Sequence, residues 1–359
     1  MNGIATFDNI TVSKAGTGYT LTATGASLSS DTSAPFNIVS GAPAKLAFTT
    51  QPPSTAQSGA SFGVGVTVQD AAGNTVVGNS SSVTLVLTTP GGATLSGTTT
   101  KAATAGVATF SGLSIDQAGM YTLTASDGAL TTAVSSSITI SHGAAAKLVF
   151  TSQPPASVAT GTGFGAVVTV QDAAGNAVTG NSSQVSVALT TANGATLNGI
   201  KTVAASNGVA TFSGLSVAQI GSYSLTATDG TLALATSSAF AITPGAAASI
   251  VFMTQPVNPL AGAAFGVAIS VQDSLGNVET GDGTTQITLS TNVCGNPVLR
   301  TVTVSAGVAQ FPDLRFYTPG NNRQLTAQAS IGLGVNSTPF TVQANQDLIF
   351  ADAFAACTP

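Results

Sequence analysis

The sequence of 359 residues contains no tryptophan, a single histidine and a single glutamate, and only 6% of its residues are charged. An average soluble domain has about 25% charged residues, so solubility here must depend on hydroxyl groups and exposed turns instead of ion pairs. The eight lysines and arginines are scattered and the net charge is −5, which argues against a nucleic-acid partner. No apolar run approaches the roughly 18 residues of a membrane-spanning helix, so we expect no membrane span.

The scarcity of ionisable side chains also restricts catalysis. A Ser–His–acid triad would have to use His142, which lies in a short linker. Ser61 lies within GASFG, the letters of a nucleophile elbow, but a strand and not a helix is expected to follow it. Glu279 lies near Asp273 and Asp282, where solvated loop acids are a simpler interpretation than a hydrolase carboxylate pair. We therefore expect no catalytic residue and no zinc site, which would need three or four ligands.

The two cysteines, Cys294 and Cys357, allow two interpretations. They are either unpaired thiols or a disulfide that holds the C-terminal tail to the last domain. The position of Cys357 near the end of the sequence, where a chain otherwise frays, favours the disulfide. Closing a loop of this size would contribute about 4 kcal/mol in the chain-entropy model.

An internal repeat organises the sequence. AKLAFTTQPP begins at Ala44, AKLVFTSQPP at Ala146 and ASIVFMTQPV at Ala248, so both spacings equal 102 residues. Two further motifs recur within each unit: VQDAAGN, VQDAAGN and VQDSLGN, and then GVATF, GVATF and GVAQF. Self-similarity of this kind identifies a tandem array of one structural unit.

The first 40 residues match only the second part of the repeat. GIATF at Gly3 corresponds to GVATF at Gly106, and YTLTA at Tyr19 corresponds to YTLTA at Tyr121. We therefore expect the chain to begin inside a truncated domain. The predicted boundaries are a half-domain over 1–40, full domains over 41–142 and 143–244, a divergent last domain over 245–343, and a tail over 344–359.

Apolar residues alternate with small or polar residues along each unit. In the segment 62–68, for example, Phe62, Val64, Val66 and Val68 share one face. Strict alternation predicts a half-buried strand, and turn signals such as Ala72-Gly73-Asn74 separate the segments. About seven short strands in roughly 100 residues predict a two-sheet sandwich with almost no helix. The fold class is therefore all-β.

Two further features bear on how the units are built and joined. Tyr19, Tyr121 and Tyr223 each begin a strand, where a sandwich often has a tyrosine corner, whereas Arg323 takes this place in the last repeat, so we expect the corner to be lost there. The linkers have about four residues each, as in Ser40-Gly41-Ala42-Pro43. Such short linkers predict a semi-rigid rod of stacked domains and not beads on a flexible string.

The motifs VTVQDAAGN, GVATFSGLS and AGxYTLTA resemble the bacterial Ig-like repeats of invasin- and intimin-type surface or secreted proteins. The resemblance covers residues 1 to about 343. It implies tandem Ig-like β-sandwiches, an extracellular or cell-surface location and an adhesive or spacing role without catalytic residues. Residues 347–354 more weakly resemble a short C-terminal motif of some secreted bacterial proteins.

Calcium is the one cofactor that the motifs suggest, and weakly. Asp and Asn recur four residues apart in all three full repeats, at Asp70/Asn74, Asp172/Asn176 and Asp273/Asn277. Calcium takes six to eight oxygen ligands, usually with several carboxylates, so a turn with one carboxylate supplies few of the ligands that calcium needs. Local hydrogen bonding of the Asp to a Gly-Asn turn is the simpler interpretation.

The last full repeat departs most from the others. A candidate recognition surface there comprises Glu279, Asp282, Arg300, Arg315 and Arg323. Capping of a terminal repeat is the alternative explanation for its divergence.

We expect a non-catalytic structural or adhesive stalk segment of a bacterial extracellular protein. Its partners are then itself, through strand complementation or a filament, or a host or matrix polymer. The half-domain has an apolar face and open sheet edges, so it must be disordered, fold against the first repeat or borrow strands from another molecule, and we expect self-association through this edge. A polymer- or carbohydrate-binding accessory region of a secreted hydrolase is the alternative, and a hydrolase in its own right is the third.

Overall fold

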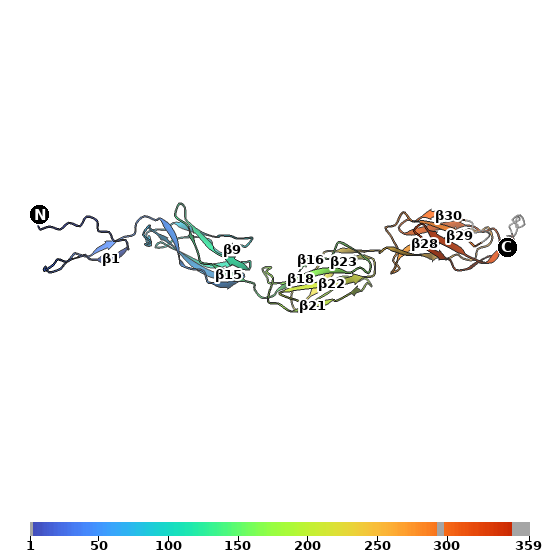
Figure 1. Cartoon of the computed structure of the whole chain (residues 1–359), viewed down its shortest axis with the longest axis horizontal. Coiled ribbons are helices and arrows are strands. Elements are labelled where there is room, and N and C mark those ends of the chain that lie inside the picture. The colour runs from blue at the N-terminus through green and yellow to red at the C-terminus, as the bar shows by residue number, and fades with distance from the viewer. Residues whose placement is uncertain (1–2, 293–297, 347–359) are drawn as a thin grey trace. The chain divides into compact units, whose positions relative to one another are not determined.

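The computed structural model describes residues 3–292 and 298–346, and Figure 1 shows their strands. Every regular element in these ranges is a β-strand, which confirms the expected all-β fold. No helix that could cross a membrane occurs within the same ranges. Cys294, Cys357 and the motif at 347–354 lie outside the described residues, so the disulfide stays a prediction.

The first full repeat folds into a β-sandwich. One layer is the sheet β5-β7-β11-β9, and the other consists of β10-β8-β13-β14 together with the small sheet β12-β15-β6. The strands are β5 (Lys45–Thr50), β6 (Thr55–Gln57), β7 (Phe62–Gln69), β8 (Ser82–Leu87), β9 (Leu95–Ser96), β10 (Thr100–Ala102), β11 (Val107–Ile115), β12 (Gly119–Tyr121), β13 (Leu123–Ser126), β14 (Ala133–Val134) and β15 (Ile138–Ser141).

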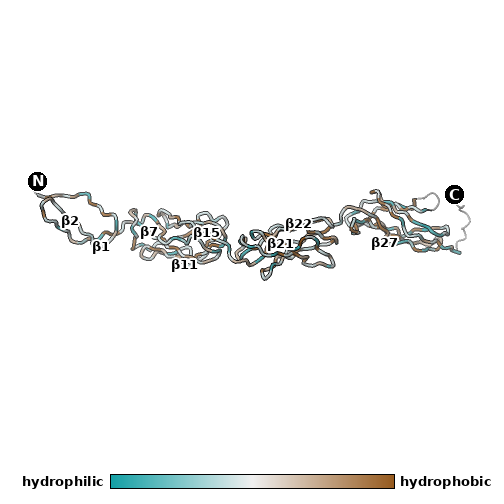
Figure 2. Tube along the Cα trace, turned by 60° about the horizontal axis from the view of Figure 1, so that its bottom comes forward, coloured by the Kyte–Doolittle hydropathy of each residue, from teal (hydrophilic) through white to brown (hydrophobic). Residues whose placement is uncertain are grey.

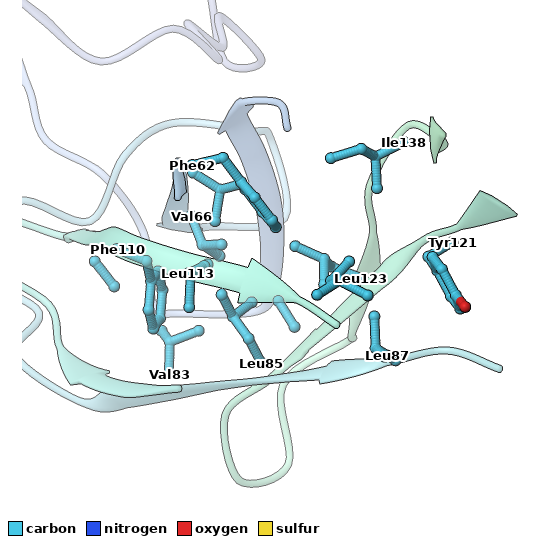
Figure 3. Packing of buried hydrophobic residues seen from close by; sticks show 14 of the residues in the cluster. Phe62, Val66, Val83, Leu85, Leu87, Phe110, Leu113, Tyr121, Leu123 and Ile138 are labelled. Carbon is cyan, nitrogen blue, oxygen red and sulfur yellow. The ribbon is translucent and has the colours of Figure 1, made fainter. Parts of the chain in front are cut away.

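The core of this sandwich lies between the layers. Figure 3 shows Phe62 and Val66 of β7, Leu85 of β8 and Phe110 of β11 packed among other apolar side chains. Phe110 is 1% exposed and Val66 is 0% exposed. The two-residue alternation therefore directs side chains inward as predicted, because successive residues of a strand point to opposite faces.

The second repeat has the same strand order, with sheets β16-β18-β22-β20, β21-β19-β24-β25 and β17-β26-β23. Its strands are β16 (Lys147–Ser152), β17 (Ser157–Ala159), β18 (Phe164–Gln171), β19 (Gln184–Leu189), β20 (Leu197–Asn198), β21 (Thr202–Ala204), β22 (Val209–Val217), β23 (Gly221–Tyr223), β24 (Leu225–Thr228), β25 (Ala235–Thr236) and β26 (Phe240–Thr243). Identical topology follows from near-identical alternation in the two repeats.

The third repeat keeps this plan with sheets β27-β28-β31, β30-β29-β33-β34 and β32-β35. Its strands are β27 (Ala247–Thr254), β28 (Phe265–Asp273), β29 (Gln286–Thr291), β30 (Val298–Thr303), β31 (Val308–Leu314), β32 (Gly320–Arg323), β33 (Leu325–Ala329), β34 (Gly334–Asn336) and β35 (Phe340–Val342). Its core again contains a phenylalanine at the GVAQF position, Phe311, which is 0% exposed.

The glutamine of each QPP motif fastens the start of the repeat to its end. The Oε1 atoms of Gln51 and Gln153 accept hydrogen bonds from the N–H groups of Ser136 and Ser238, at 2.8 and 2.9 Å. In the third repeat Gln255 accepts the corresponding bond from the Thr338 N–H at 2.9 Å. The recurring QPP motif therefore has a structural role.

The tyrosine corner is present in two of the predicted places. The hydroxyl of Tyr223 donates to the carbonyl of Gln219 at 3.2 Å, and that of Tyr19 donates to the carbonyl of Lys14 at 3.0 Å. The tyrosine is absent at Arg323, as expected, but the contact with the backbone is kept. The guanidinium of Arg323 donates to the carbonyl of Pro319 at 3.2 Å, so it replaces the phenol hydroxyl as the donor.

Residues 3–39 form four short strands in two small sheets, β1-β4 and β2-β3. The hydropathy colouring of Figure 2 shows apolar residues along this segment as along the full repeats. Its strands are β1 (Gly16–Tyr19), β2 (Thr22–Ala23), β3 (Asp31–Thr32) and β4 (Phe36–Ile38). These pairings match β12 with β15 and β13 with β14 of the first repeat. The segment therefore has the internal pairings of the second part of a repeat.

Candidate functional site: the Asp–Asn turns at the repeat junctions

The turn after β7 is organised by the carboxylate of Asp70. One oxygen accepts the backbone N–H of Asn74 at 2.8 Å, and the other accepts the side-chain amide of Asn74 at 2.9 Å. The second oxygen also accepts the N–H of Gly41 in the preceding linker at 2.8 Å. Asp70 therefore joins the turn to the linker, which no local turn motif requires.

The second repeat reproduces this arrangement. One carboxylate oxygen of Asp172 accepts the backbone N–H of Asn176 at 2.8 Å. The other accepts the side-chain amide of Asn176 at 2.9 Å and the N–H of the linker residue Gly143 at 2.8 Å. A closed network of this kind fixes the rotamer of the asparagine, and so it also sets the direction of the amide oxygen, which takes no part in the network.

The asparagine of each turn forms hydrogen bonds with the preceding repeat or, at the first junction, with the N-terminal segment 3–39. Asn74 donates to the carbonyl of Ser13 at 2.8 Å and accepts the N–H of Ala15 at 2.9 Å. Asn176 makes the same two contacts at equivalent positions, donating to the carbonyl of Asp116 at 2.9 Å and accepting the N–H of Ala118 at 2.8 Å. One amide thus satisfies a backbone acceptor and a backbone donor of its neighbour.

The third junction keeps part of this set. Asn277 donates to the carbonyl of Ala218 at 3.1 Å. The carboxylate of Asp273 accepts the linker N–H of Gly245 at 3.1 Å and the hydroxyl of Thr160 in the second repeat at 2.6 Å. A side chain of the neighbouring repeat therefore contacts the aspartate directly at this junction.

All of these bonds lie within compact units of the chain. The first unit comprises Met1–Lys147, Val170–Ser182 and Ser206–Gly208, and contains the bonds of Asn74 and Asn176. The second unit comprises Leu148–Thr169, Ser183–Ala205 and Val209–Pro359, and contains those of Asn277.

Hydrogen bonding keeps the three carboxylates ionised. The side-chain bond from Asn74 and the bond from the Gly41 N–H lower the pKa of Asp70 to about 2. Burial acts to raise the pKa of Asp172, but the bonds from Gly143 and Asn176 outweigh it and the pKa is lowered. Burial likewise acts to raise the pKa of Asp273, but the bonds from Thr160 and Gly245 outweigh it and the pKa is lowered. The aspartates are therefore fixed anionic acceptors.

This geometry bears on the calcium candidates. In each turn the carboxylate oxygens face N–H or hydroxyl donors of the protein, and the asparagine amide donates to the same carboxylate. Within residues 3–292 and 298–346 no three His, Cys, Asp or Glu side chains gather in a group that could hold a metal ion. The sequence pattern revealed the residues, and the hydrogen bonds reveal their contacts with the preceding unit.

Two of the five candidate recognition residues come together in the structure. Arg300 and Arg315 line one pocket of about 310 Å³ in the third repeat, together with Tyr317. Arg315 also donates to the carbonyl of Gly262, just before β28, at 2.6 Å. Glu279 and Asp282 follow the far end of β28, and nine strand residues span about 30 Å. Arg323 belongs to the corner described above.

The two acids have different environments. Asp282 accepts the N–H groups of Thr284 and Thr285 at 2.9 and 3.0 Å, which is an ordinary loop arrangement. Glu279 takes the position of Val76 and Val178 in the other repeats, and its Oε1 atom is buried without a hydrogen bond. Burial, followed by the charges of the neighbouring aspartates, raises the pKa of Glu279.

No family model matches the chain, and no curated protein matches it. Among solved structures, it is similar to the Escherichia coli adhesin FdeC, with 19% identity, a TM-score of 0.37, and coverage of 86% of this chain and 100% of that one. The chain is a tandem array of Ig-like β-sandwiches.

Two other structures are similar at the same level. InvD of Yersinia pseudotuberculosis shows 19% identity and a TM-score of 0.37, with 84% of this chain and 98% of that chain covered. An I-band fragment of titin shows 16% identity and a TM-score of 0.29, with 85% of this chain and all of that chain covered (100%). At these identities and TM-scores the similarities carry no argument about this chain, and both its fold and its function must be argued from its own residues.

Proposed function

We propose that this chain is a non-catalytic structural segment of a bacterial extracellular protein, a stalk in which consecutive Ig-like repeats are held in a defined arrangement. The observation that carries the proposal is the recurring Asp–Asn turn. At each of the three junctions its asparagine donates a hydrogen bond to a backbone carbonyl of the preceding repeat or, at the first junction, of the N-terminal segment. Short linkers restrict the available orientations further.

The chemistry of the turns suits this role. Each aspartate fixes its own linker through the glycine N–H, so linker and turn move together. Carboxylate acceptors form stronger hydrogen bonds than neutral ones, and the lowered pKa values of Asp70 and Asp172 keep these carboxylates charged further into the acidic range. The paucity of charged side chains on the repeats agrees with an extracellular location, where a surface rich in hydroxyl groups suffices for solubility.

Small-angle X-ray scattering tests the stalk. The triple substitution N74A/N176A/N277A removes the contacts with preceding units and keeps every core residue. We expect a broader distribution of interatomic distances, together with the loss of stability that follows from removing the side-chain bonds of these asparagines to Asp70, Asp172 and Asp273. The matched control is Asn79→Ala, because Asn79 accepts hydrogen bonds from Ser81 within its own repeat. Identical scattering curves for wild type and triple variant would contradict the proposal.

The proposal includes self-association through residues 3–39. Large apolar side chains are exposed there, among them Ile4 (80%), Phe7 (72%) and Leu28 (77%). Sedimentation equilibrium of the full chain should show a concentration-dependent dimer that Phe7→Asp abolishes. A monomer at every concentration would remove this part of the proposal and leave the stalk untouched.

A polymer-binding accessory role is the second candidate, favoured by the pocket of Arg300, Arg315 and Tyr317. Tyr317 is 65% exposed, and two guanidinium groups beside one aspartate give the pocket a net positive charge. An acidic polysaccharide has the matching chemistry. In affinity electrophoresis we expect retardation by polygalacturonate and about tenfold weaker binding by Arg300→Ala, with Lys201→Ala as control. Equal mobility with and without polygalacturonate would contradict this role.

A further inference from the structure

A small set of groups on one repeat receives the Asp–Asn turn of the next, and we call this set the docking end. In the first repeat it comprises the carbonyl of Asp116, the N–H of Ala118 and the hydroxyl of Ser58. Asn176 donates to the Asp116 carbonyl at 2.9 Å and accepts the Ala118 N–H at 2.8 Å. The Ser58 hydroxyl lies 3.0 Å from the same amide nitrogen. One asparagine amide therefore meets a donor and two acceptors.

The linker glycine belongs to the same contact. Gly143 donates its N–H to the carboxylate of Asp172 at 2.8 Å. A Cβ atom on Gly143 would already lie 3.5 Å from the Oδ2 atom of that carboxylate. Glycine therefore lets the linker backbone come close to the aspartate of the turn.

The docking end of the second repeat follows the same plan. Thr160 takes the place of Ser58, and its hydroxyl donates to Asp273 at 2.6 Å. The carbonyl of Ala218 takes the place of that of Asp116 and accepts from Asn277 at 3.1 Å. A hydroxyl, a backbone carbonyl and a glycine linker are thus common to both docking ends.

Two backbone hydrogen bonds identify the equivalent residues of the third repeat. The first, at 2.8 Å in every repeat, joins the N–H of a docking-end residue to a carbonyl at or just after the end of the last strand: Ser58 to Ser141, Thr160 to Thr243 and Ala261 to Gln343. The second joins the following glycine to the residue before the Asp116 position: Gly59 to Ile115, Gly161 to Val217 and Gly262 to Phe316. Counting from these bonds, Ala261, Pro319 and Asn345 take the places of Ser58, Ala118 and Gly143.

Each replacement changes a group that the contact uses. Proline has no N–H, so Pro319 cannot donate to the amide oxygen of an incoming asparagine. Ala261 has no hydroxyl. Asn345 places a side chain where the linker otherwise has glycine, and its amide donates to the carbonyl of Ala261 at 3.1 Å. An asparagine of the third repeat itself thus binds at the residue position that Asn176 contacts in the first repeat.

Arg315 binds a second carbonyl at this end. Its guanidinium donates to the carbonyl of Gly262 at 2.6 Å, whereas a serine, Ser114 or Ser216, takes the place of Arg315 in the other repeats. Two adjacent backbone carbonyls therefore accept hydrogen bonds from side chains of the third repeat. The first and second repeats instead present the corresponding end to the turn of their neighbour.

We propose that the docking end of the third repeat is closed to the Asp–Asn turn of any repeat of this pattern, and that Ala261, Pro319 and Asn345 close it. An asparagine that approached this end would find no donor for its amide oxygen and no hydroxyl beside its nitrogen. The same three positions make the first repeat receptive when they hold Ser58, Ala118 and Gly143. The inference rests on the proposed stalk function, because it requires that the turns hold consecutive repeats.

An added repeat tests the closed end. Residues 144–244 are fused after Asn345, in the register that Ala144 has after Gly143, in a chain with Cys294 replaced. Spin labels at the exposed position Thr303 and at the Ala174 position of the added repeat give the distance distribution across the new junction. The reference is the natural junction of the first and second repeats, labelled at Lys101 and Ala174 in the chain without the addition.

We expect the distribution across the new junction to be about twofold wider than the reference, because only the linker restrains the added repeat. The triple substitution A261S/P319A/N345G should narrow it to the width of the reference. Pro312→Ala is the matched control, since Pro312 is an exposed proline within β31, and should leave the distribution wide. A narrow distribution with the unsubstituted end overturns the inference, and so does a wide one that the triple substitution leaves unchanged.

The reciprocal variant S58A/A118P/G143N gives the first repeat of the natural chain the residues of the closed end. We expect the natural junction to widen, whereas Ala118→Ser, which keeps the N–H group, should leave it narrow. A natural junction that stays narrow in the reciprocal variant overturns the inference.

Asn176→Ala separates this inference from the proposed function. If Asn176→Ala leaves the natural junction narrow, the turns do not hold the repeats, and the stalk proposal and this inference both fail. If Asn176→Ala widens the natural junction while the unsubstituted third repeat holds an added repeat firmly, the stalk proposal stands and this inference alone fails.

Discussion

Replacing Phe311 with alanine is expected to lower the free energy of unfolding of the third repeat by about 3–5 kcal/mol. Phe311 is 0% exposed in the core between β28 and the second layer, so its removal leaves a cavity among residues that cannot collapse without disturbing both sheets. Hydrogen exchange of the β28 amides against denaturant measures the effect on this repeat alone. A repeat-resolved method is needed because tandem repeats do not unfold as one two-state system.

The matched substitution is Phe7→Ala, at the equivalent position of the N-terminal segment. Because Phe7 is 72% exposed, this change should alter stability by less than about 0.5 kcal/mol. Equal losses at Phe7 and Phe311 would show that the face of residues 3–39 is already covered. A loss below about 1 kcal/mol at Phe311 would contradict the core assignment of the third repeat.

The substitution Glu279→Val is expected to stabilise the third repeat by about 1–3 kcal/mol at pH 7. Glu279 occupies the place of Val76 and Val178, and its Oε1 atom is buried without a hydrogen-bond partner. Valine removes an unsatisfied polar atom and restores the apolar contact of the other repeats. Urea denaturation followed by hydrogen exchange in β28 measures the gain.

The gain should depend on pH. Burial, and then the charges of Asp273 and Asp282, raise the pKa of Glu279 above its ordinary value of 4.5. A carboxyl with a raised pKa contributes stability below its unfolded pKa and loses it as the pH rises through the folded pKa. The difference between Glu279→Val and wild type should therefore grow as the pH rises above about 4.5. A constant difference from pH 4 to pH 8 would show that the carboxyl is solvated.

The fold was predictable because it depends on local alternation and on repetition. Phe62, Val64 and Val66 alternate strictly, and all three are buried in β7. Repetition multiplies such evidence, since each repeat predicts the same strands. Residues 4–12 show the limit of the argument: they have the same alternation as β11 but no partner, and a strand needs its partner's hydrogen bonds.

The junctions were predictable in part. Recurrence of Asp70 and Asn74 marked a turn, and the turn is present. The contact of Asn74 with Ser13 could not be predicted, because it depends on how a side chain meets the backbone of another unit. The available signal was that asparagine recurs at the position of Asn74 although the local turn does not strictly require it there.

The charged residues of the third repeat lie in different parts of its structure, which the sequence could not reveal. Arg315 precedes β32 and contacts Gly262 just before β28, while Glu279 follows β28 at its other end. The replacement of tyrosine by Arg323 also concealed a contact that Tyr223 makes in the second repeat, because a guanidinium can donate to the equivalent carbonyl. Residue type alone does not reveal such equivalence.

The central claim is that Asn176 holds the second repeat against the first through the backbone of Asp116 and Ala118. The most direct test is a distance distribution between spin labels at the exposed positions Lys101 and Ala174, which both belong to the first compact unit, with Cys294 and Cys357 replaced. We predict a narrow distribution for the wild type and for Asn79→Ala, and a markedly broader one for Asn176→Ala. Distributions of equal width for Asn176→Ala and the wild type would contradict the claim.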